Sequence, residues 1–294
     1  MARVRRKRLG KQSYYYLEHS TRDSGKVRKR EIYLGKKLPQ NVEQIKRKLI
    51  ADIHGEKWHP LLERIKENYV RERRSTPASS RVKEIENFAI RFTYDTQKIE
   101  GSTLTLRETA NLFERGITPK DRAIEDVREA EAHKRLFYEI LGSSKDLSLG
   151  AILEWHKKLF YETKPDIAGK IRKNRIGISG SRFVPPLPVE VYPLLRDFFR
   201  WYGGNKDRVQ PVELAALVHL KFVTIHPFAD GNGRISRLMM NFVLNRKGYP
   251  MLNIPYEGRN GYYSALERAQ VKKRNNVFVL WFLKKYAKAN KEYL

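Results

Sequence analysis

Apolar residues recur every three or four positions between about residue 80 and residue 290, which is the spacing of amphipathic helices. Residues 176–188 interrupt this spacing with Gly, Pro and β-branched residues, and we expect a short β-hairpin there. The chain after residue 80 should therefore be a bundle of helices that carries one hairpin. The expected helices are 82–99, 106–115, 123–141, 149–160, 189–202, 212–224, 231–247, 260–270 and 277–289.

The first 38 residues have a different pattern. A tyrosine-rich run and a second β-prone run ending at Leu34 flank a turn at residues 23–25, whose sequence is Asp-Ser-Gly. This pattern predicts a β-hairpin or a three-stranded meander, and a sheet of that size should pack on the next part of the chain. Helical spacing returns after residue 39 but is broken near Pro60, which predicts a helical connector. We thus expect three parts, over residues 1–38, 39–79 and 80–294.

Composition and charge narrow the chemistry. The chain has no cysteine, which excludes disulfides, thiolate metal sites and cysteine nucleophiles. The formal net charge of +27 favours polyanionic partners. Residues 1–40 hold 13 Lys and Arg against 3 Asp and Glu. Two alternatives stay open for residues 1–38: a solvated basic surface, or a nucleic-acid surface in which cations bind phosphates and tyrosines stack on bases.

The distribution of apolar residues also bears on location. No run approaches the roughly 20 apolar residues of a membrane span. The basic start lacks the apolar run of a secretory signal. We therefore expect no membrane partner and a cytoplasmic location.

Side chains suited to hydroxyl chemistry occur after the helix expected at 212–224. His226 precedes Pro227, which pushes it out of the helical conformation and ends the helix. Histidine has the pKa class of a general base that takes a proton from a hydroxyl. Asp230 is a hard carboxylate suited to a Mg²⁺ ion that bridges phosphates.

The next residues along the chain suit a phosphate ligand. Gly231 and Gly233 let the backbone approach a ligand just before a helix N-terminus, where anions bind. Arg234 and Arg237 are three positions apart, so they share a helix face and can both bind phosphate oxygens. Each feature alone is weak evidence, and the joint pattern predicts a nucleotide site.

The string HPFADGNGRISR over residues 226–237 resembles the motif of the Fic family, H-x-F-x-D-G-N-G-R-x-x-R, with every specified position present. The resemblance implies a mainly α, Fic-type helical bundle whose motif joins two central helices. It implies transfer of AMP from ATP, with Mg²⁺, to a Ser, Thr or Tyr hydroxyl of a target protein. Gly233 favours AMP transfer, because members of the Doc branch carry Lys there and transfer the γ phosphoryl group. The implied roles are His226 as general base, Asp230 as Mg²⁺ ligand, Phe228 as buried anchor, Gly231, Asn232 and Gly233 as phosphate cradle, and Arg234 and Arg237 as ligands of the β and γ phosphates.

A second string, TQKIEG from Thr96 to Gly101, resembles the family's inhibitory motif, [S/T]-x-x-x-E-[G/N]. By itself Glu100 followed by Gly101 is simply a helix end with a glycine cap. The resemblance implies that Glu100 pairs with Arg237, so that the γ phosphate loses its ligand and ATP binds unproductively. We therefore expect an autoinhibited enzyme, with AMP removal by the same site as an alternative net reaction.

The resemblance also assigns two regions outside these strings. The expected hairpin corresponds to the family's target-positioning flap, which pairs with an extended substrate segment; a surface hairpin without function is the alternative. The start of the helix expected at 260–270 corresponds to the adenine pocket, although aromatic residues there are more often core. Family members often dimerise, so a homodimer is a candidate assembly. The residues that the resemblance assigns to these two regions are Ile178, Ser179, Gly180, Arg182 and Phe183 in the flap, and Asn260, Tyr262 and Tyr263 in the adenine pocket.

Two other classes of function stay open. One is a nucleic-acid-associated regulator that acts through residues 1–38, and the other is an interaction scaffold with an inactive site, against which the complete motif argues. His219, seven residues before His226, is a candidate to pack beneath the site. The remaining histidines show no metal-ligand spacing and are expected at ordinary surface or core positions. They are His19, His54, His59, His133 and His156.

Overall fold

The computed structural model describes residues 2–23 and 26–294. The chain divides into two compact units, Met1–Glu63 and Arg64–Leu294. Two residues of the turn predicted at 23–25, Ser24 and Gly25, lie outside the described residues. The functional division into residues 1–38, 39–79 and 80–294 stays a prediction.

The first unit contains a three-stranded antiparallel sheet in the order β1 (Arg3–Leu9), β2 (Gln12–Asp23) and β3 (Lys26–Gly35). The three-stranded meander is therefore confirmed. Buried Ala2 and Leu17 of the sheet segment pack with Leu49 of α1 (Val42–Ser75) in a small core. Because side chains alternate across a strand, Tyr14 and Tyr16 on β2 face away from that core.

Helix α1 is continuous from Val42 to Ser75 and has Pro60 inside it. The predicted break near Pro60 is wrong. Proline removes one backbone hydrogen bond from a helix, but the other turns of this 34-residue helix keep theirs. The two stretches of helical spacing on either side of Pro60 belong to one helix.

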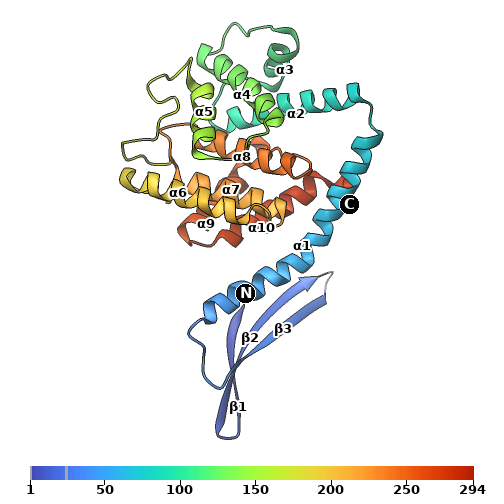
Figure 1. Ribbon diagram of the computed structural model, residues 1–294, viewed down its shortest axis with the longest axis vertical. Coiled ribbons are helices and arrows are strands. Elements are labelled where there is room, and N and C mark those ends of the chain that lie inside the picture. The colour runs from blue at the N-terminus through green and yellow to red at the C-terminus, as the bar shows by residue number, and fades with distance from the viewer. Residues whose placement is uncertain (1, 24–25) are drawn as a thin grey trace. The chain divides into compact units, whose positions relative to one another are not determined.

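The second unit is built around α7 (Pro211–Ile225) and α8 (Asn232–Arg246), whose side chains are mostly buried. Figure 1 shows α8 between α2, α4 and α5 on one side and α7, α9 and α10 on the other. Every helix predicted after residue 80 is present, and the mainly helical fold class is confirmed. None of the helices among the described residues is both long and apolar enough to cross a membrane. The other elements are α2 (Ala78–Ile99), α3 (Leu106–Arg115), α4 (Ile124–Gly142), α5 (Leu149–Phe160), α6 (Pro188–Asn205), η1 (Tyr256–Gly258), α9 (Arg259–Val271), α10 (Asn275–Ala289) and η2 (Lys291–Tyr293).

Residues 176–187 form an irregular loop and Pro188 begins α6, so the predicted hairpin is wrong. A turn is closed at Ser181, whose backbone N–H donates to the Ile178 carbonyl oxygen at 3.0 Å. Pro185 and Pro186 explain the absence of strands over these residues, because proline has no N–H to donate to a β ladder. The Gly and β-branched residues that suggested a hairpin therefore lie in a loop.

The sheet of the first unit should be acid-sensitive through Glu18. Hydrogen bonds from Lys29, at 2.7 Å, and from Arg5, at 3.1 Å, lower the pKa of Glu18 from 4.5 to about 2. A carboxylate with a lower pKa in the folded state stabilises the fold above pH 4.5 and loses that contribution as the pH falls towards 2. We predict that amide exchange in β2, corrected for intrinsic rates, accelerates over that range, and that Glu18→Gln flattens the dependence.

The matched control is Glu43→Gln at the exposed start of α1. It should leave the acid dependence of β2 as in the unchanged protein. An identical acid dependence in Glu18→Gln and the unchanged protein would contradict the assignment to Glu18.

Candidate active site

His226 ends α7 and adopts a left-handed backbone conformation with φ of 52°. Its Nδ1 lies 3.0 Å from the carbonyl oxygen of Val223. A carbonyl oxygen only accepts, so Nδ1 carries the proton and Nε2 keeps its lone pair. Burial lowers the pKa of His226, so the ring is neutral at physiological pH. Nε2 is therefore able to take a proton from a hydroxyl.

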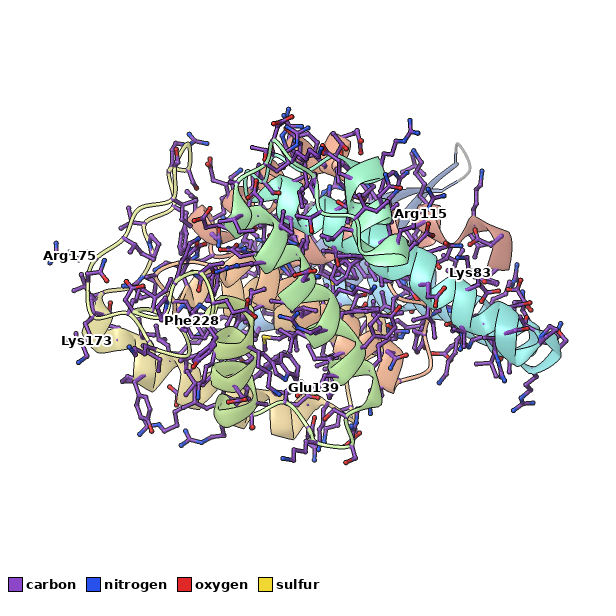
Figure 2. The ribbon with its side chains drawn as sticks, turned by 90° about the horizontal axis from the view of Figure 1, so that it is seen from above. Lys83, Arg115, Glu139, Lys173, Arg175 and Phe228 are labelled. Carbon is purple, nitrogen blue, oxygen red and sulfur yellow. The ribbon has the colours of Figure 1, made fainter. Side chains whose placement is uncertain are left out.

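Asn232 closes the loop between the two central helices. Its Oδ1 accepts from the Phe228 backbone N–H at 2.9 Å, and its Nδ2 donates to the Phe228 carbonyl oxygen at 2.8 Å. Phe228 is fully buried, and its ring stacks on that of His156 with centroids 3.8 Å apart. Figure 2 places Phe228 in the interior of the second unit and Lys173 and Arg175 at its edge. The Asn232 side chain thus holds the loop, while its backbone N–H lies at the N-terminus of α8.

His156 on α5 supports the same loop from outside the motif. Its Nδ1 accepts from the Gly169 backbone N–H at 2.9 Å, so Nε2 carries the proton and donates to the Asp230 carbonyl oxygen at 3.0 Å. Burial lowers the pKa of His156 to about 4, which keeps the ring neutral. The sequence indicated no role for His156, because it stands 74 positions from Asp230 and only the fold brings them together.

Close packing explains both glycines of the motif. Gly231 has φ of 77°, and a Cβ there would collide with the Phe160 ring. A Cβ at Gly233 would collide with the Glu100 carboxylate and lie 3.1 Å from the Arg237 guanidinium. Gly233 therefore leaves the space in which the Glu100 carboxylate lies.

Arg237 is 1% exposed and is held by the C-terminal end of α2. Its Nε donates to Thr96 Oγ1 at 2.6 Å, and one terminal nitrogen donates to Glu100 Oε1 at 2.5 Å. The other terminal nitrogen lies 3.3 Å from the Tyr262 hydroxyl, which contacts His219 Nε2 at 3.0 Å. The ion pair expected from the sequence is thus present, and His219 packs beneath it.

Arg234 is 3% exposed and lies between two carboxylates. One terminal nitrogen donates to Glu129 Oε2 and, at 3.0 Å, to Gln97 Oε1. The other donates to Asp230 Oδ1 at 3.1 Å. Neither Glu129 nor Gln97 was singled out in the sequence, because a carboxylate or amide inside a helix has no local signature of a site.

Asp230 also pairs with a lysine that the sequence patterns did not indicate. Lys164 Nζ lies 2.6 Å from Asp230 Oδ2 and 3.2 Å from Glu129 Oε1. Burial alone would raise the pKa of Asp230, but the charge of Arg234 and the hydrogen bond from Lys164 outweigh burial and hold this pKa below its usual value. Asp230 is therefore a carboxylate at neutral pH.

The metal-binding capacity of the site rests on this one carboxylate. Among the residues that the structure describes, no group of three or more His, Cys, Asp or Glu side chains could hold a metal ion. Asp230 is 37% exposed, which leaves it accessible to a cation. This donor set fits Mg²⁺ held largely by phosphate oxygens and water, because Mg²⁺ commonly takes only one or two protein carboxylates.

The loop over 176–187 is held at two points, Pro186 and Arg182. Arg172 donates from Nε to the His226 carbonyl oxygen at 2.7 Å and from a terminal nitrogen to the Pro186 carbonyl oxygen at 2.6 Å. Arg182 donates to Glu267 Oε1 on α9 at 3.0 Å. Arg172 thus joins the segment of the predicted flap residues to the backbone at His226, and Glu267 joins it to α9. The other flap residues, Ile178, Ser179, Gly180 and Phe183, lie in the same loop.

The residues assigned to the adenine pocket occupy different environments. Tyr262 is 1% exposed and lies behind Arg237, so its ring contributes to the core. Tyr263 is 44% exposed, and its hydroxyl donates to the Ile99 carbonyl oxygen at 3.0 Å. Asn260 is exposed at the start of α9. Gly101 comes after the end of α2 with φ of 104°, a conformation that favours glycine.

The loop should depend strongly on the burial of Phe228. We predict that Phe228→Ala lowers the free energy of unfolding by about 3–5 kcal/mol, because it removes a fully buried ring and leaves a cavity. Chemical denaturation followed by circular dichroism measures the change. Phe199→Ala is the matched control, because Phe199 on α6 is only half-buried. An equal loss in both variants would contradict the special role of Phe228.

Known proteins are similar to this chain in sequence and in fold. Residues 146–244 match the family model described as Fic/DOC family. Over 180 residues, the chain is 36% identical to the protein adenylyltransferase Fic of Drosophila yakuba, a match that covers 60% of this chain and 36% of the relative. The chain thus spans about a third of the length of such curated relatives.

Two solved structures resemble the fold at 25% sequence identity and a TM-score of 0.72. One is a Fic-domain-containing signalling protein from Bacteroides thetaiotaomicron, with 79% of this chain and 96% of that chain covered. The other is Fic-1 from Caenorhabditis elegans, with 87% and 77% covered. The match to the family model includes the whole loop from His226 to Arg237. Residues 146–244 of this chain therefore form a domain of the Fic/DOC family.

Proposed function

We propose that this protein is an adenylyltransferase that moves AMP from ATP to a hydroxyl side chain of a target protein. The observation that carries the proposal is a neutral His226, with Nε2 free to accept a proton, beside a helix N-terminus that bears two buried arginines. The curated relatives named protein adenylyltransferase support the same activity. Tyr, Ser and Thr all supply the hydroxyl that this chemistry needs.

In the proposed reaction, His226 Nε2 takes the proton of the target hydroxyl, whose oxygen attacks the α phosphorus of ATP. The new bond joins that oxygen to phosphorus, and the bond from the α phosphorus to the bridging oxygen breaks, so pyrophosphate leaves. Arg234 and Arg237, which now pair with Glu129 and Glu100, would neutralise the charge of the leaving group. Backbone N–H groups of residues 231–233 supply further donors at the start of α8.

The residues present fit Mg²⁺ as a partner of ATP. When bound, Mg²⁺ would neutralise phosphate charge beside Asp230. Lys164 and Arg234 provide the counter-charge of Asp230 in this structure. A cation bound there would compete with the Lys164 ammonium for the Asp230 carboxylate.

We further propose that the enzyme is autoinhibited by Glu100. Arg237 already pairs with Glu100, and a guanidinium bound by a carboxylate is unavailable to a γ phosphate. The Glu100 carboxylate also lies against Gly233, within the space that a phosphate would approach. AMP removal stays an alternative net reaction, because the same carboxylate could position water against a phosphodiester. A homodimer and a cytoplasmic location remain predictions.

The proposal predicts which label reaches protein and which variants respond. With ATP labelled at the α phosphate, Glu100→Ala should incorporate at least tenfold more label than the unchanged protein, because Arg237 is released. Adding His226→Ala should abolish incorporation, and ATP labelled at the γ phosphate should leave protein unlabelled. Glu84→Ala, which removes an exposed carboxylate from the same helix, is the matched control. Label from the γ phosphate alone would indicate phosphoryl transfer, and no label in Glu100→Ala would contradict the proposed activity.

A second function is favoured by the face of the sheet that points away from the core of the first unit. Tyr33 is 53% exposed, and its ring centroid lies 5.3 Å from that of Tyr16 and 6.3 Å from that of Tyr14. The Lys7 ammonium lies 4.2 Å from the Tyr16 ring centroid. Exposed aromatic rings with cations among them suit single-stranded nucleic acid, in which bases stack on rings and phosphates pair with cations. We propose that this face binds such a strand.

This binding should fall steeply with salt and depend on the tyrosines. Fluorescence anisotropy of labelled single-stranded DNA and RNA would give affinities between 50 and 200 mM salt. Tyr33→Ala should weaken binding by about 1–3 kcal/mol, the contribution of one stacked base. Tyr192→Ala, at a similarly exposed position on α6, should leave affinity unchanged. Equal affinities of both variants, or affinity independent of salt, would contradict this second function.

A further inference from the structure

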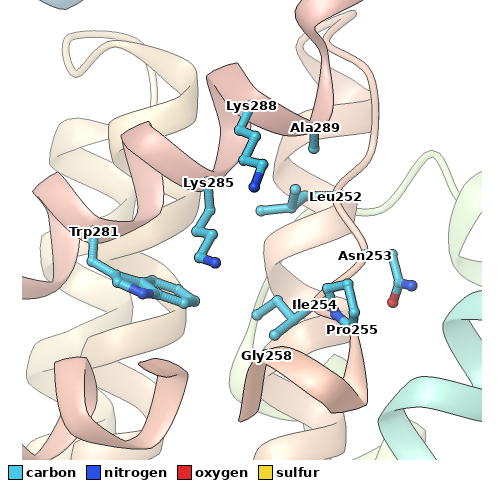
Figure 3. Close-up of a pocket in the computed structure, with 9 residues that line it drawn as sticks. All are labelled: Leu252, Asn253, Ile254, Pro255, Gly258, Trp281, Lys285, Lys288 and Ala289. Carbon is cyan, nitrogen blue, oxygen red and sulfur yellow. The ribbon is translucent and has the colours of Figure 1, made fainter. Parts of the chain in front are cut away.

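A cavity of about 260 Å³ lies between residues 252–258 and α10, and no residue of the 226–237 motif lines it. Its walls are largely apolar and include Leu252, Ile254 and Trp281. Figure 3 shows the ammonium groups of Lys285 and Lys288, both on α10, pointing from the helix towards residues 252–258. The cavity therefore combines an apolar interior with two cations.

The charged groups around this cavity are able to bind a ligand. Within the described part of the chain, neither Lys285 nor Lys288 pairs with a carboxylate, although the Lys285 ammonium lies 5.9 Å from the Trp281 ring centroid. Asn253 also lines the cavity, but its Nδ2 is used by Asp95 and its Oδ1 only accepts, so the two lysines are the groups that can pair with an anion. A flat apolar body that carries an oxyanion would contact the indole ring and pair with the lysines.

One wall of the cavity, formed by residues 252–258, is hydrogen-bonded to α2, the helix that ends next to Glu100. Asn253 Nδ2 donates to Asp95 Oδ2 at 2.5 Å, and the Tyr256 backbone N–H donates to Asp95 Oδ1 at 2.9 Å. Asp95 is 1% exposed on α2, so these bonds are shielded from water. The next residue, Thr96, holds Arg237 through its hydroxyl. The wall is thus one residue away from the contacts that position Arg237.

The same wall reaches α2 at a second point. It ends at Gly258, where α9 begins, and the Tyr263 hydroxyl on α9 donates to the Ile99 carbonyl oxygen at 3.0 Å. Ile99 directly precedes Glu100, whose carboxylate pairs with Arg237. Residues 252–263 therefore contact the last turn of α2 at Asp95 and at Ile99, on either side of Thr96.

We propose that this cavity is a regulatory site for a small aromatic oxyanion, and that the bound ligand stabilises the arrangement in which Glu100 pairs with Arg237. The cavity is formed while the wall is bonded to Asp95 and the ion pair is closed. A ligand that binds this conformation shifts the population towards it. The effect on AMP transfer rests on the proposed function, whereas ligand binding does not.

Binding is tested on the full chain by isothermal titration calorimetry with 2-naphthoate, 2-naphthyl phosphate and the uncharged 2-naphthamide. At least one anion should bind about tenfold more tightly than the amide, and the double variant Lys285→Ala, Lys288→Ala should lose about tenfold in affinity. The stronger anion identifies carboxylate or phosphate as the preferred group. Lys284→Ala, on the same helix but outside the cavity, should bind as the unchanged protein does.

Coupling is tested by amide hydrogen exchange over residues 95–101. The bound anion should slow exchange there in the unchanged protein. It should not slow exchange in Asp95→Ala, which lacks both hydrogen bonds to residues 253 and 256. It should slow exchange less in Tyr263→Phe, which lacks the hydrogen bond to Ile99. AMP incorporation should fall with the anion in the unchanged protein and stay constant in Glu100→Ala.

The outcomes separate this inference from the proposed function. If neither anion binds, or if the double variant and Lys284→Ala bind equally, the site is wrong. If an anion binds while exchange over residues 95–101 is unchanged, the coupling is wrong. If Glu100→Ala transfers no AMP, the proposed function fails, while binding and exchange still decide the regulatory site.

Discussion

The geometry of the site depends on the two hydrogen bonds by which the Asn232 side chain clasps the Phe228 backbone. These bonds are buried, so they are shielded from competing water, and the Phe228 ring fills the space beneath them. With Phe228 fixed, His226 is held two residues before it and Asp230 two residues after it. These two hydrogen bonds therefore fix a neutral histidine and a carboxylate in a short loop between two buried helices.

Two arginines taken out of water determine much of the surrounding structure. A guanidinium cannot lose its proton, so a buried one must be paired with anions or acceptors. Glu129 and Asp230 meet this need for Arg234, and Glu100 and Thr96 meet it for Arg237. The pairing of Arg237 with Glu100 therefore both balances the charge of a buried arginine and causes the proposed inhibition. The proposed regulatory cavity acts on the same arrangement, because its wall is bonded to the helix that carries Glu100.

Sequence patterns predicted the helices well because each buries one face against its neighbours, which imposes regular apolar spacing. They failed at Pro60, where one missing hydrogen bond does not end a long helix, and at residues 176–188, where prolines prevent strand pairing. They also missed His156, Glu129, Lys164, Arg172 and Glu267. These residues act through partners far away in the chain, and a single side chain of common type inside a helix or loop gives no local signal.

The sequence by itself determined the order of histidine, carboxylate, glycines and arginines between His226 and Arg237, because that order is set by spacing along one loop and one helix turn. It also determined that Glu100 ends a helix before a glycine. Only the tertiary structure decided that α2 brings Glu100 and Thr96 onto Arg237, and that Lys164 and Glu129 meet at Asp230. The physical reason is that burying an ion pair needs both partners at contact distance, and packing of helices distant in sequence sets that distance.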